Sequence, residues 1–84
     1  MVKPLKFTRH AATSALEREV QMEWINNAVF QPDWTMPDPD DPELERRFAI
    51  IKDFGGRALR VVCFENEQEV RIVTVFFDRK AKKP

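Results

Sequence analysis

His10 is the only histidine in this chain, and histidine is the side chain whose ordinary pKa lies nearest to neutral pH. A histidine can take or give a proton there, and a neighbouring arginine can stabilise negative charge on a phosphate. His10 and Arg18 could therefore supply both parts of a metal-independent phosphodiester cleavage. The simpler interpretation is that His10 caps or packs near the start of its helix, while Arg18 pairs with Glu17 or Glu45.

Three further arginines stand in the apolar segments of the C-terminal half: Arg47, Arg60 and Arg71. A guanidinium group presents paired donors that match phosphate oxygens, so these residues are candidates for a phosphate-bearing substrate. We assign Arg60 to catalysis with His10 and Arg18, and Arg47 and Arg71 to substrate binding. The alternative is that the three arginines form cross-strand salt bridges with Glu69 or with the acidic residues of the loop before them.

The sequence predicts no metal or cofactor site. Cys63 is the only cysteine, which excludes a disulfide within the chain and a cysteine-rich zinc site. Its apolar neighbours favour a buried structural thiol. Asp38, Asp40 and Asp41 have a spacing found among calcium ligands, but prolines interrupt them and the expected glycine is missing, so we expect a solvated loop. Neither a phosphate-binding glycine loop nor a nucleophile elbow is present.

Length and composition favour one small domain. A chain of 84 residues supports a single core, and we expect one domain over residues 1–84 with a frayed basic tail at 79–84. Fourteen basic and fourteen acidic residues give no net charge, which counts against a strongly basic nucleic-acid binder but leaves room for a local basic patch. Residues 1–7 lack the apolar stretch of a signal peptide, and no run approaches the roughly 20 residues of a membrane span. We therefore expect a cytoplasmic protein.

Helical spacing of apolar residues predicts two helices in the N-terminal half. Residues 2–7 read as an extended lead-in that could be a strand. Thr8 is a plausible N-cap for a helix over 9–19. A second helix is predicted over 22–30, because Pro32 disfavours helical geometry in the residue before it. The stretch 32–45 holds four prolines and six acidic residues, and it reads as a long connection.

The C-terminal half predicts a three-stranded antiparallel meander. Residues 46–53, 57–64 and 70–77 are rich in Val, Ile and Phe. Gly55 and Gly56 predict a tight hairpin turn between the first two strands, and the polar residues 65–69 predict a second turn. The fold class is therefore α+β, with two N-terminal helices packed on the meander and a possible short N-terminal strand.

The expected register assigns each strand residue to one of two faces. If Gly55 and Gly56 form the whole loop, Ile50 lies opposite Val61. The face toward the helices then holds Phe48, Ile50, Leu59, Val61, Cys63, Val70, Ile72, Thr74 and Phe76. The other face holds Arg47, Ala49, Ile51, Arg60, Val62, Phe64, Arg71, Val73, Val75 and Phe77. An apolar face carrying arginines is typical of a binding surface, unless the N-terminal segment or the long loop covers it.

Scattered positions along most of the chain resemble a bacterial family of unknown function. They are the run from Phe7 to Ala11, then Arg18, Val20, Trp24-Ile25, Ala28-Val29, Pro32-Asp33, Arg46 to Phe48, Gly56 to Val62, and Ile72 to Phe76. The same order of segments is similar to the BrnT toxins, which resemble RelE-type ribonucleases in fold. The chain departs from the unknown-function family at Ser14, where an arginine is usual, and at Glu19, where glycine is favoured. The second departure predicts a less sharply turned connection between the helices.

The resemblance implies a toxin-type domain that acts on RNA through basic residues of the sheet and is masked by an antitoxin-like protein. A different class of function is also open. The chain could be a non-catalytic interaction domain that binds a partner, or a second copy of itself, through the arginine-bearing sheet face. The neutral net charge and Ser14 favour this second hypothesis.

Overall fold

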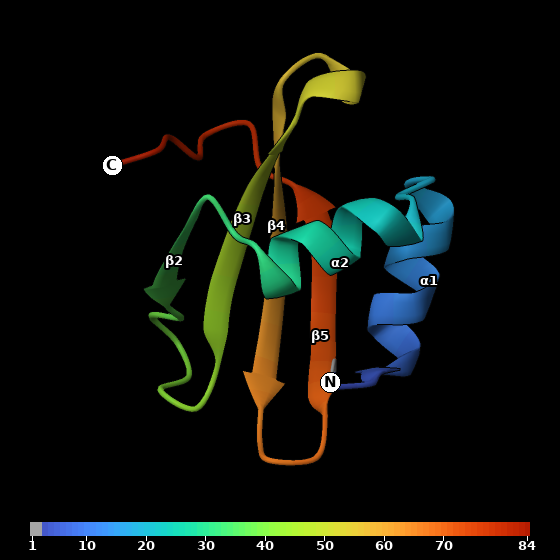
Figure 1. Cartoon of the computed structure of the whole chain (residues 1–84), viewed down its shortest axis with the longest axis vertical. Coiled ribbons are helices and arrows are strands. Elements are labelled where there is room, and N and C mark those ends of the chain that lie inside the picture. Colours follow the sequence, from blue (N-terminus) through green and yellow to red (C-terminus); the bar gives the residue numbers. More distant parts are fainter. Residues whose placement is uncertain (1–2) are drawn as a thin grey trace.

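A computed structural model describes residues 3–84 as a five-stranded sheet with two helices. The strands are β1 (Leu5–Phe7), β2 (Trp34–Pro37), β3 (Glu45–Ile51), β4 (Arg57–Glu65) and β5 (Val70–Phe77). The helices are α1 (Arg9–Glu17) and α2 (Met22–Phe30). In the sheet the strands follow the order β1-β5-β4-β3-β2. Figure 1 shows α2 crossing one face of the sheet and α1 running beside β5.

The expected α+β class is confirmed, but the sheet has five strands rather than three. The predicted meander is present as β3, β4 and β5. The N-terminal lead-in forms β1, which pairs in parallel with β5 from Leu5 opposite Val70 to Phe7 opposite Ile72; Val2 lies outside the described residues. Within residues 3–84, no helix is long and apolar enough to cross a membrane.

The long connection after α2 is more ordered than its composition predicts. Its first part is β2, which pairs with β3 and stacks Trp34 on Phe48 at a centroid distance of 4.7 Å. The turn that follows is held by Asp38, whose carboxylate accepts hydrogen bonds from the amides of Asp40 and Asp41. The turn is therefore closed by one of its own side chains. Of the three aspartates only Asp40 is exposed as expected of a solvated loop, and Asp38 and Asp41 are partly buried.

The predicted hairpin register between β3 and β4 is wrong. A short 3₁₀ turn, Lys52–Phe54, precedes the two glycines, so the loop is longer than the glycine pair alone. Gly55 and Gly56 both have positive φ, as their position in a reversing loop requires. Ile50 therefore lies opposite Ala58 instead of Val61. A shift by an odd number of residues moves every side chain of β3 to the other face.

A β-bulge causes the second difference in face assignment. Val62 pairs with Thr74 and Cys63 pairs with Ile72, which leaves Val73 unpaired on β5. Beyond the bulge the alternation of β5 is reversed. The buried face under the helices therefore holds Ala49, Ile51, Leu59, Val61, Cys63, Val70, Ile72 and Val75. Phe48, Ile50, Thr74 and Phe76 lie on the opposite face, contrary to the expected pattern.

The two ends of α1 are fixed by backbone and side-chain caps. The predicted N-cap is confirmed, because the Thr8 hydroxyl accepts a hydrogen bond from the amide of Ala11 at 3.1 Å. At the C-terminus the amide of Glu19 donates to the carbonyl of Leu16, and that of Val20 to Ala15. This is a Schellman motif, which needs a left-handed residue at its turn. Glu19 supplies it with a φ of 53°, so the connection is sharply turned after all.

This turn predicts that Glu19→Gly stabilises the protein. A left-handed conformation costs a residue with a Cβ about 1–2 kcal/mol, and glycine avoids that cost. Part of the gain is offset by the greater freedom of glycine in the unfolded chain. We expect the free energy of unfolding to rise by about 0.5–1 kcal/mol, measured by urea titration.

Glu17→Gly is the matched control, because Glu17 has ordinary helical geometry at the end of α1. There glycine should lower the free energy of unfolding by about 1 kcal/mol. Equal destabilisation by both substitutions would contradict the argument from backbone strain.

Candidate functional site

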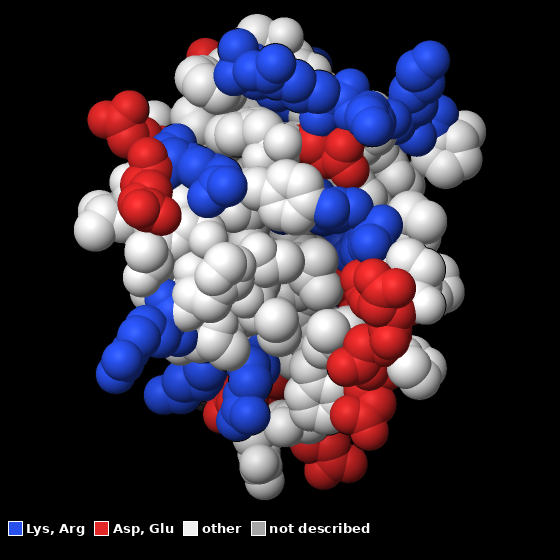
Figure 2. All heavy atoms as spheres, turned by 180° about the vertical axis from the view of Figure 1, so that it is seen from behind, with Lys and Arg blue, Asp and Glu red and all other residues white. Residues whose placement is uncertain are grey.

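The sheet face opposite the helices carries most of the polar groups that could do chemistry. Figure 2 views the molecule from that side and shows a largely uncharged centre with positive side chains around it. Negative side chains lie along one edge and, in a smaller group, at the opposite upper edge. The pairing registers place on this face Lys6, Trp34, Met36, Arg46, Phe48, Ile50, Ala58, Arg60, Val62, Phe64, Arg71, Thr74 and Phe76. We call this surface the open face.

His10 stands at the border of the open face, where α1 begins. The Thr8 amide donates to the Ile72 carbonyl at 3.0 Å, and the Thr8 hydroxyl donates to the Val73 carbonyl at 3.2 Å. These bonds hold the first turn of α1 against β5. His10 Nε2 consequently lies 3.3 Å from Thr74 Oγ1, in hydrogen-bond contact, while the ring remains exposed. His10 is therefore oriented toward the sheet rather than capping its own helix.

Arg71 and Lys6 lie on the same side of the sheet as His10. They are direct partners in the parallel β1–β5 ladder, and both are exposed. Arg71 pairs with Glu69 at 3.3 Å, the partner that one sequence alternative names, but the two residues lie two positions apart at the start of β5 and not across strands. With Phe7 and Thr8 these residues line a shallow hollow of about 370 Å³. Lys6 was missed by the sequence argument, and only its pairing with β5 brings it to this site.

Arg60 lies at the centre of the open face but is held by its neighbours. Its guanidinium carbon sits 4.1 Å from the centre of the Phe76 ring, and its Nη1 lies 3.3 Å from Asp78 Oδ2. Burial lowers the pKa of Arg60, with a further contribution from the positive charge of Arg46. The buried Nε of Arg60 has no hydrogen-bond partner within the described residues. Asp78 also begins a turn, since its carbonyl accepts from the amide of Ala81.

Arg47 is not on the open face, and the expectation that it joins Arg60 there is wrong. The shifted register places Arg47 on the helix side, where its Nη1 donates to the Val29 carbonyl at the end of α2. Its Nε and Nη2 each lie 2.7 Å from a carboxylate, of Glu45 and Glu65 respectively. Burial would lower the pKa of Arg47, but these two hydrogen bonds outweigh it and raise it. Arg47 thus ties α2 to the sheet.

Arg46 takes the place on the open face that the sequence argument gives to Arg47. It is the direct cross-strand partner of Val62 and of Met36. Its Nε lies 3.0 Å from Asp38 Oδ1, so the acidic turn after β2 neutralises it. This ion pair is of the kind foreseen between the sheet arginines and the acidic loop, with a different arginine in it.

Arg18 is not brought to His10. The two residues lie eight positions apart on one helix, which separates them by about 12 Å along its axis. Arg18 is the C-cap of α1. There it lines a different pocket, of about 270 Å³, with Phe54, Phe77 and two other arginines. Neither ion pair foreseen for Arg18, with Glu17 or with Glu45, forms within residues 3–84.

Cys63 and the acidic residues do not assemble a metal centre in the described part of the chain. No group of three or more His, Cys, Asp or Glu side chains could hold a metal ion there. Cys63 is 1% exposed on the helix side of β4, which confirms the expected buried thiol. Burial raises the pKa of this thiol to about 11, so it stays protonated and unreactive at neutral pH.

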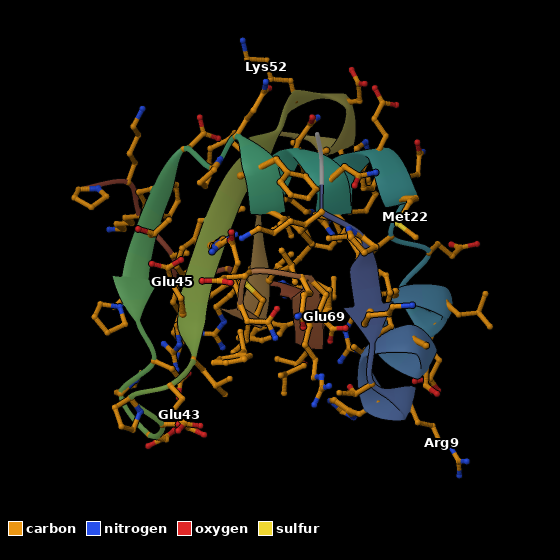
Figure 3. All side chains as sticks on the ribbon, turned by 60° about the horizontal axis from the view of Figure 1, so that its bottom comes forward. Arg9, Met22, Glu43, Glu45, Lys52 and Glu69 are labelled. Atoms are coloured by element: carbon orange, nitrogen blue, oxygen red, sulfur yellow. The ribbon has the colours of Figure 1, made fainter. Side chains whose placement is uncertain are left out.

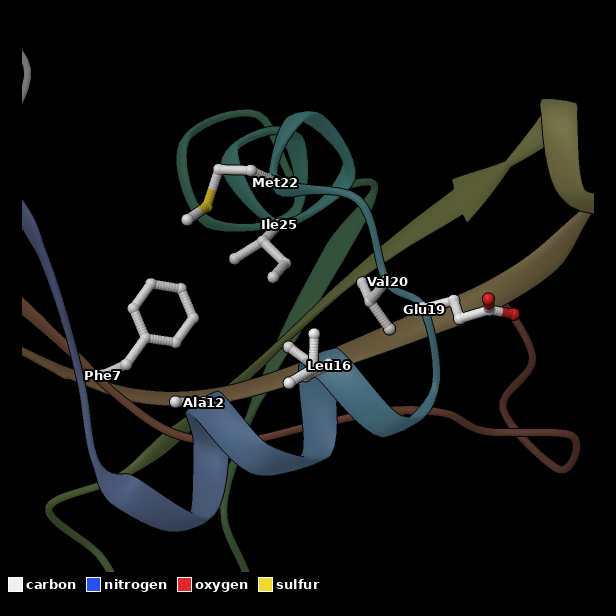
Figure 4. A pocket seen from close by; sticks show the side chains of 8 residues that line it. Phe7, Ala12, Leu16, Glu19, Val20, Met22 and Ile25 are labelled. Atoms are coloured by element: carbon white, nitrogen blue, oxygen red, sulfur yellow. The ribbon is translucent and has the colours of Figure 1, made fainter.

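The helix side carries an apolar groove of about 510 Å³ between α1 and α2. Figure 4 shows Phe7, Leu16, Val20 and Met22 around it, with Ile25 at the base of α2. Leu16 and Met22 are 81% and 54% exposed, respectively, so the groove is open to solvent. It holds no basic or histidine side chain among its lining residues.

Fold and site together define a small α+β domain with a helix pair on one face of the sheet and a His- and Arg-bearing open face. Residues 7–77 match the family model described as a domain of unknown function, DUF4258, and the chain belongs to that family. The match spans every element from α1 to β5, including His10, Arg60 and Arg71. No curated protein and no solved structure matches this chain.

The three-way contact of Glu65 with Arg47 and Lys3 predicts a pH-dependent part of the stability. Hydrogen bonds from Lys3 and then from Arg47 hold the pKa of Glu65 below its ordinary value of 4.5. Its contribution is therefore present above about pH 4.5 and is lost as the pH falls through the lower, folded-state pKa. We expect Glu65→Gln to lower the free energy of unfolding at pH 7 and to flatten its decline toward acid, measured by urea titration at pH 7, 5 and 3.

Glu67→Gln is the control, because Glu67 lies in the exposed β4–β5 turn and has no side-chain partner among residues 3–84. It should leave both the stability at pH 7 and the acid slope as in the wild type. If the free energy of unfolding of Glu65→Gln equals that of the wild type at all three pH values, the contact adds nothing to folding.

Proposed function

We propose that the open face binds single-stranded RNA and that the domain is a RelE- and BrnT-like toxin, a metal-independent ribonuclease of the bacterial cytoplasm. One observation carries the proposal. His10, the residue suited to proton transfer, lies on the same side of the sheet as Lys6, Arg60 and Arg71, in contact with Thr74 of β5. A general base with exposed cations beside it, here Lys6 and Arg71, is what RNA cleavage without a metal requires.

The reaction follows from the chemistry of these groups. His10 Nε2 takes the proton of a ribose 2′-hydroxyl, and the 2′-oxygen attacks the adjacent phosphorus. The bond to the 5′-oxygen breaks, leaving a 2′,3′-cyclic phosphate on one fragment, while the departing 5′-oxygen takes up a proton from water. Arg71 and Lys6 are the exposed cations that would neutralise the charge that builds on the phosphate oxygens. Thr74 would orient the imidazole through its hydroxyl group.

Arg60 has a supporting part in this proposal. Its guanidinium is already engaged by Phe76 and Asp78, so a substrate phosphate would have to compete with a carboxylate for it. Arg60 therefore contributes positive potential at the centre of the face and holds Phe76 in place. Arg47 and Arg18 take no part in the cleavage step at His10, because one lies on the opposite face and the other at the far end of α1.

The topology supports the same proposal. A helix pair packed on an antiparallel sheet is the arrangement that the resemblance to RelE-type toxins implies, and here α1 and α2 pack on a sheet whose strands β2 to β5 are antiparallel. In such toxins the open sheet face is the one an antitoxin-like protein masks. Fold likeness alone does not establish activity, and the proposal therefore depends on the His10 site.

The second candidate, a non-catalytic interaction domain, is favoured by the apolar side chains of the open face. Met36, Ile50 and Phe64 are 36–41% exposed there, and exposed apolar groups of this size often mark protein contacts. A partner or a second copy would cover them. Both candidate functions use the open face. Only the ribonuclease requires the His10 side chain for its activity.

The proposal predicts that the protein cleaves single-stranded RNA in the presence of EDTA and slows bacterial growth when expressed alone. His10→Ala should reduce the cleavage rate by about 10²–10⁴-fold, because it removes the general base. Arg71→Gln should weaken RNA binding and make it less dependent on salt, since one phosphate contact is lost. Cleavage is measured on a labelled RNA, and growth after induction.

Arg9→Ala is the matched control for His10→Ala. Arg9 is the neighbouring residue of the same helix turn, and Figure 3 shows its side chain pointing away from the sheet. The control should cleave like the wild type. Intact RNA and unimpaired growth with the wild-type protein would exclude the ribonuclease and leave the interaction domain as the function.

A further inference from the structure

A second basic pocket lies at the end of the molecule that carries the β3–β4 hairpin. Arg18 of the α1 C-cap, Arg57 at the start of β4 and Arg79 after β5 line it together with Phe54 and Phe77. Its volume is about 270 Å³. Figure 2 shows positive side chains along this end of the molecule. The three arginines come from segments far apart in sequence, so their meeting is a product of the fold.

The charges of this pocket are unbalanced. Among residues 3–84, none of the three guanidinium groups forms an ion pair, and no acidic side chain lines the pocket. The negative end of the helix dipole stabilises a positive charge at a helix C-terminus, which accounts for Arg18 without an ion pair. That explanation does not apply to Arg57 or Arg79. Guanidinium groups that converge without a carboxylate are suited to an anionic ligand, above all to a phosphate.

The floor of the pocket is aromatic. The rings of Phe54 and Phe77 lie 4.8 Å apart, and both pack against Trp24, which is buried. Phe54 is 39% exposed, and the guanidinium carbon of Arg57 sits 4.7 Å from its ring centre. A planar base can stack on the exposed part of this ring in place of the Arg57 guanidinium, which is then free to turn to the phosphate. The pocket thus combines phosphate donors with a stacking platform.

We propose that Arg18, Arg57 and Arg79 bind the phosphate of a nucleotide whose base stacks on Phe54. The nucleotide could be free or part of an RNA strand, and the pocket chemistry is the same in both cases. Only the RNA strand, as one of the two sources of this nucleotide, rests on the proposed function; binding of a free nucleotide does not depend on it. For a strand that reaches His10, this pocket is a second subsite, which fixes the strand at the other end of α1 and leaves the bond cleavage to the open face.

The test uses the full chain with two probes, adenosine 5′-monophosphate and a fluorescent ten-nucleotide single-stranded RNA, at low salt. Arg18→Gln with Arg79→Gln should weaken binding of the probe that occupies the pocket by at least tenfold. Phe54→Leu should weaken it at least threefold while leaving the arginines in place. Lys52→Gln is the matched control, because Lys52 belongs to the same hairpin and points outward in Figure 3. It should change affinity less than twofold, and thermal unfolding confirms that each variant is folded.

The outcomes separate the two sources and the two proposals. Loss of monophosphate binding in the arginine variant identifies a free-nucleotide site, and loss of RNA binding alone identifies a strand subsite. Binding of either kind in a protein that cleaves no RNA supports this pocket and defeats the ribonuclease. Wild-type affinity of the arginine variant for both probes, or equal loss in Lys52→Gln, overturns the pocket even if the protein cleaves RNA. Adenosine bound as tightly as its monophosphate also overturns it.

Discussion

The structure depends on the burial of β4 beneath α2, with α1 packed beside it on β5. Leu59, Val61 and Cys63 are each 0–1% exposed on that face, and burying a side chain of this kind is worth about 1.5–3 kcal/mol. β4 lies between β3 and β5, so both neighbours are positioned by it. Two nine-residue helices are short, about 14 Å each. They cover one face of the sheet. The opposite face carries Arg46, Arg60 and Arg71 and is covered only in part, with Phe48, Ala58 and Val62 buried on it.

Much of the fold could be predicted from the sequence. α2 and β5 have the predicted bounds, α1 and the other meander strands differ by one or two residues, and Thr8 is the N-cap. These elements follow from local signals: helical spacing, a proline after the helix, and dense Val and Ile in the strands. β2 was missed because its prolines and acidic neighbours have the composition of a loop, and only pairing with β3 makes it a strand.

The faces of the sheet could not be predicted, for two physical reasons. Nothing local indicates that Lys52–Phe54 form a 3₁₀ turn before the glycines, and nothing local indicates a bulge at Val73. The 3₁₀ turn shifts the β3–β4 pairing by three residues and the bulge shifts β5 by one, and either odd number exchanges the two faces. Because β3, β4 and β5 are apolar on both faces, a wrong register still yields two plausible faces. Arg60 and Arg71 were placed correctly since they precede the bulge and belong to the strands whose phase was right.

The candidate site was foreseen only in part for a related reason. His10 was singled out by its chemistry, but its partner Thr74 and its neighbour Lys6 depend on the parallel pairing of β1 with β5. That pairing joins residues at opposite ends of the chain, and no local pattern encodes it. Arg18 was grouped with His10 because both lie on α1. Arg18 lies eight residues further along the helix, so it reaches the pocket lined by Phe54 and Phe77 instead.

The most direct test of the open face as the functional surface is a titration of the ¹⁵N-labelled protein with single-stranded RNA, followed by amide chemical shifts. The account predicts the largest changes at Lys6, His10, Arg71 and Thr74, with the helix-side groove around Leu16 and Met22 unaffected. Changes confined to that groove, or no changes at any RNA concentration, would contradict it.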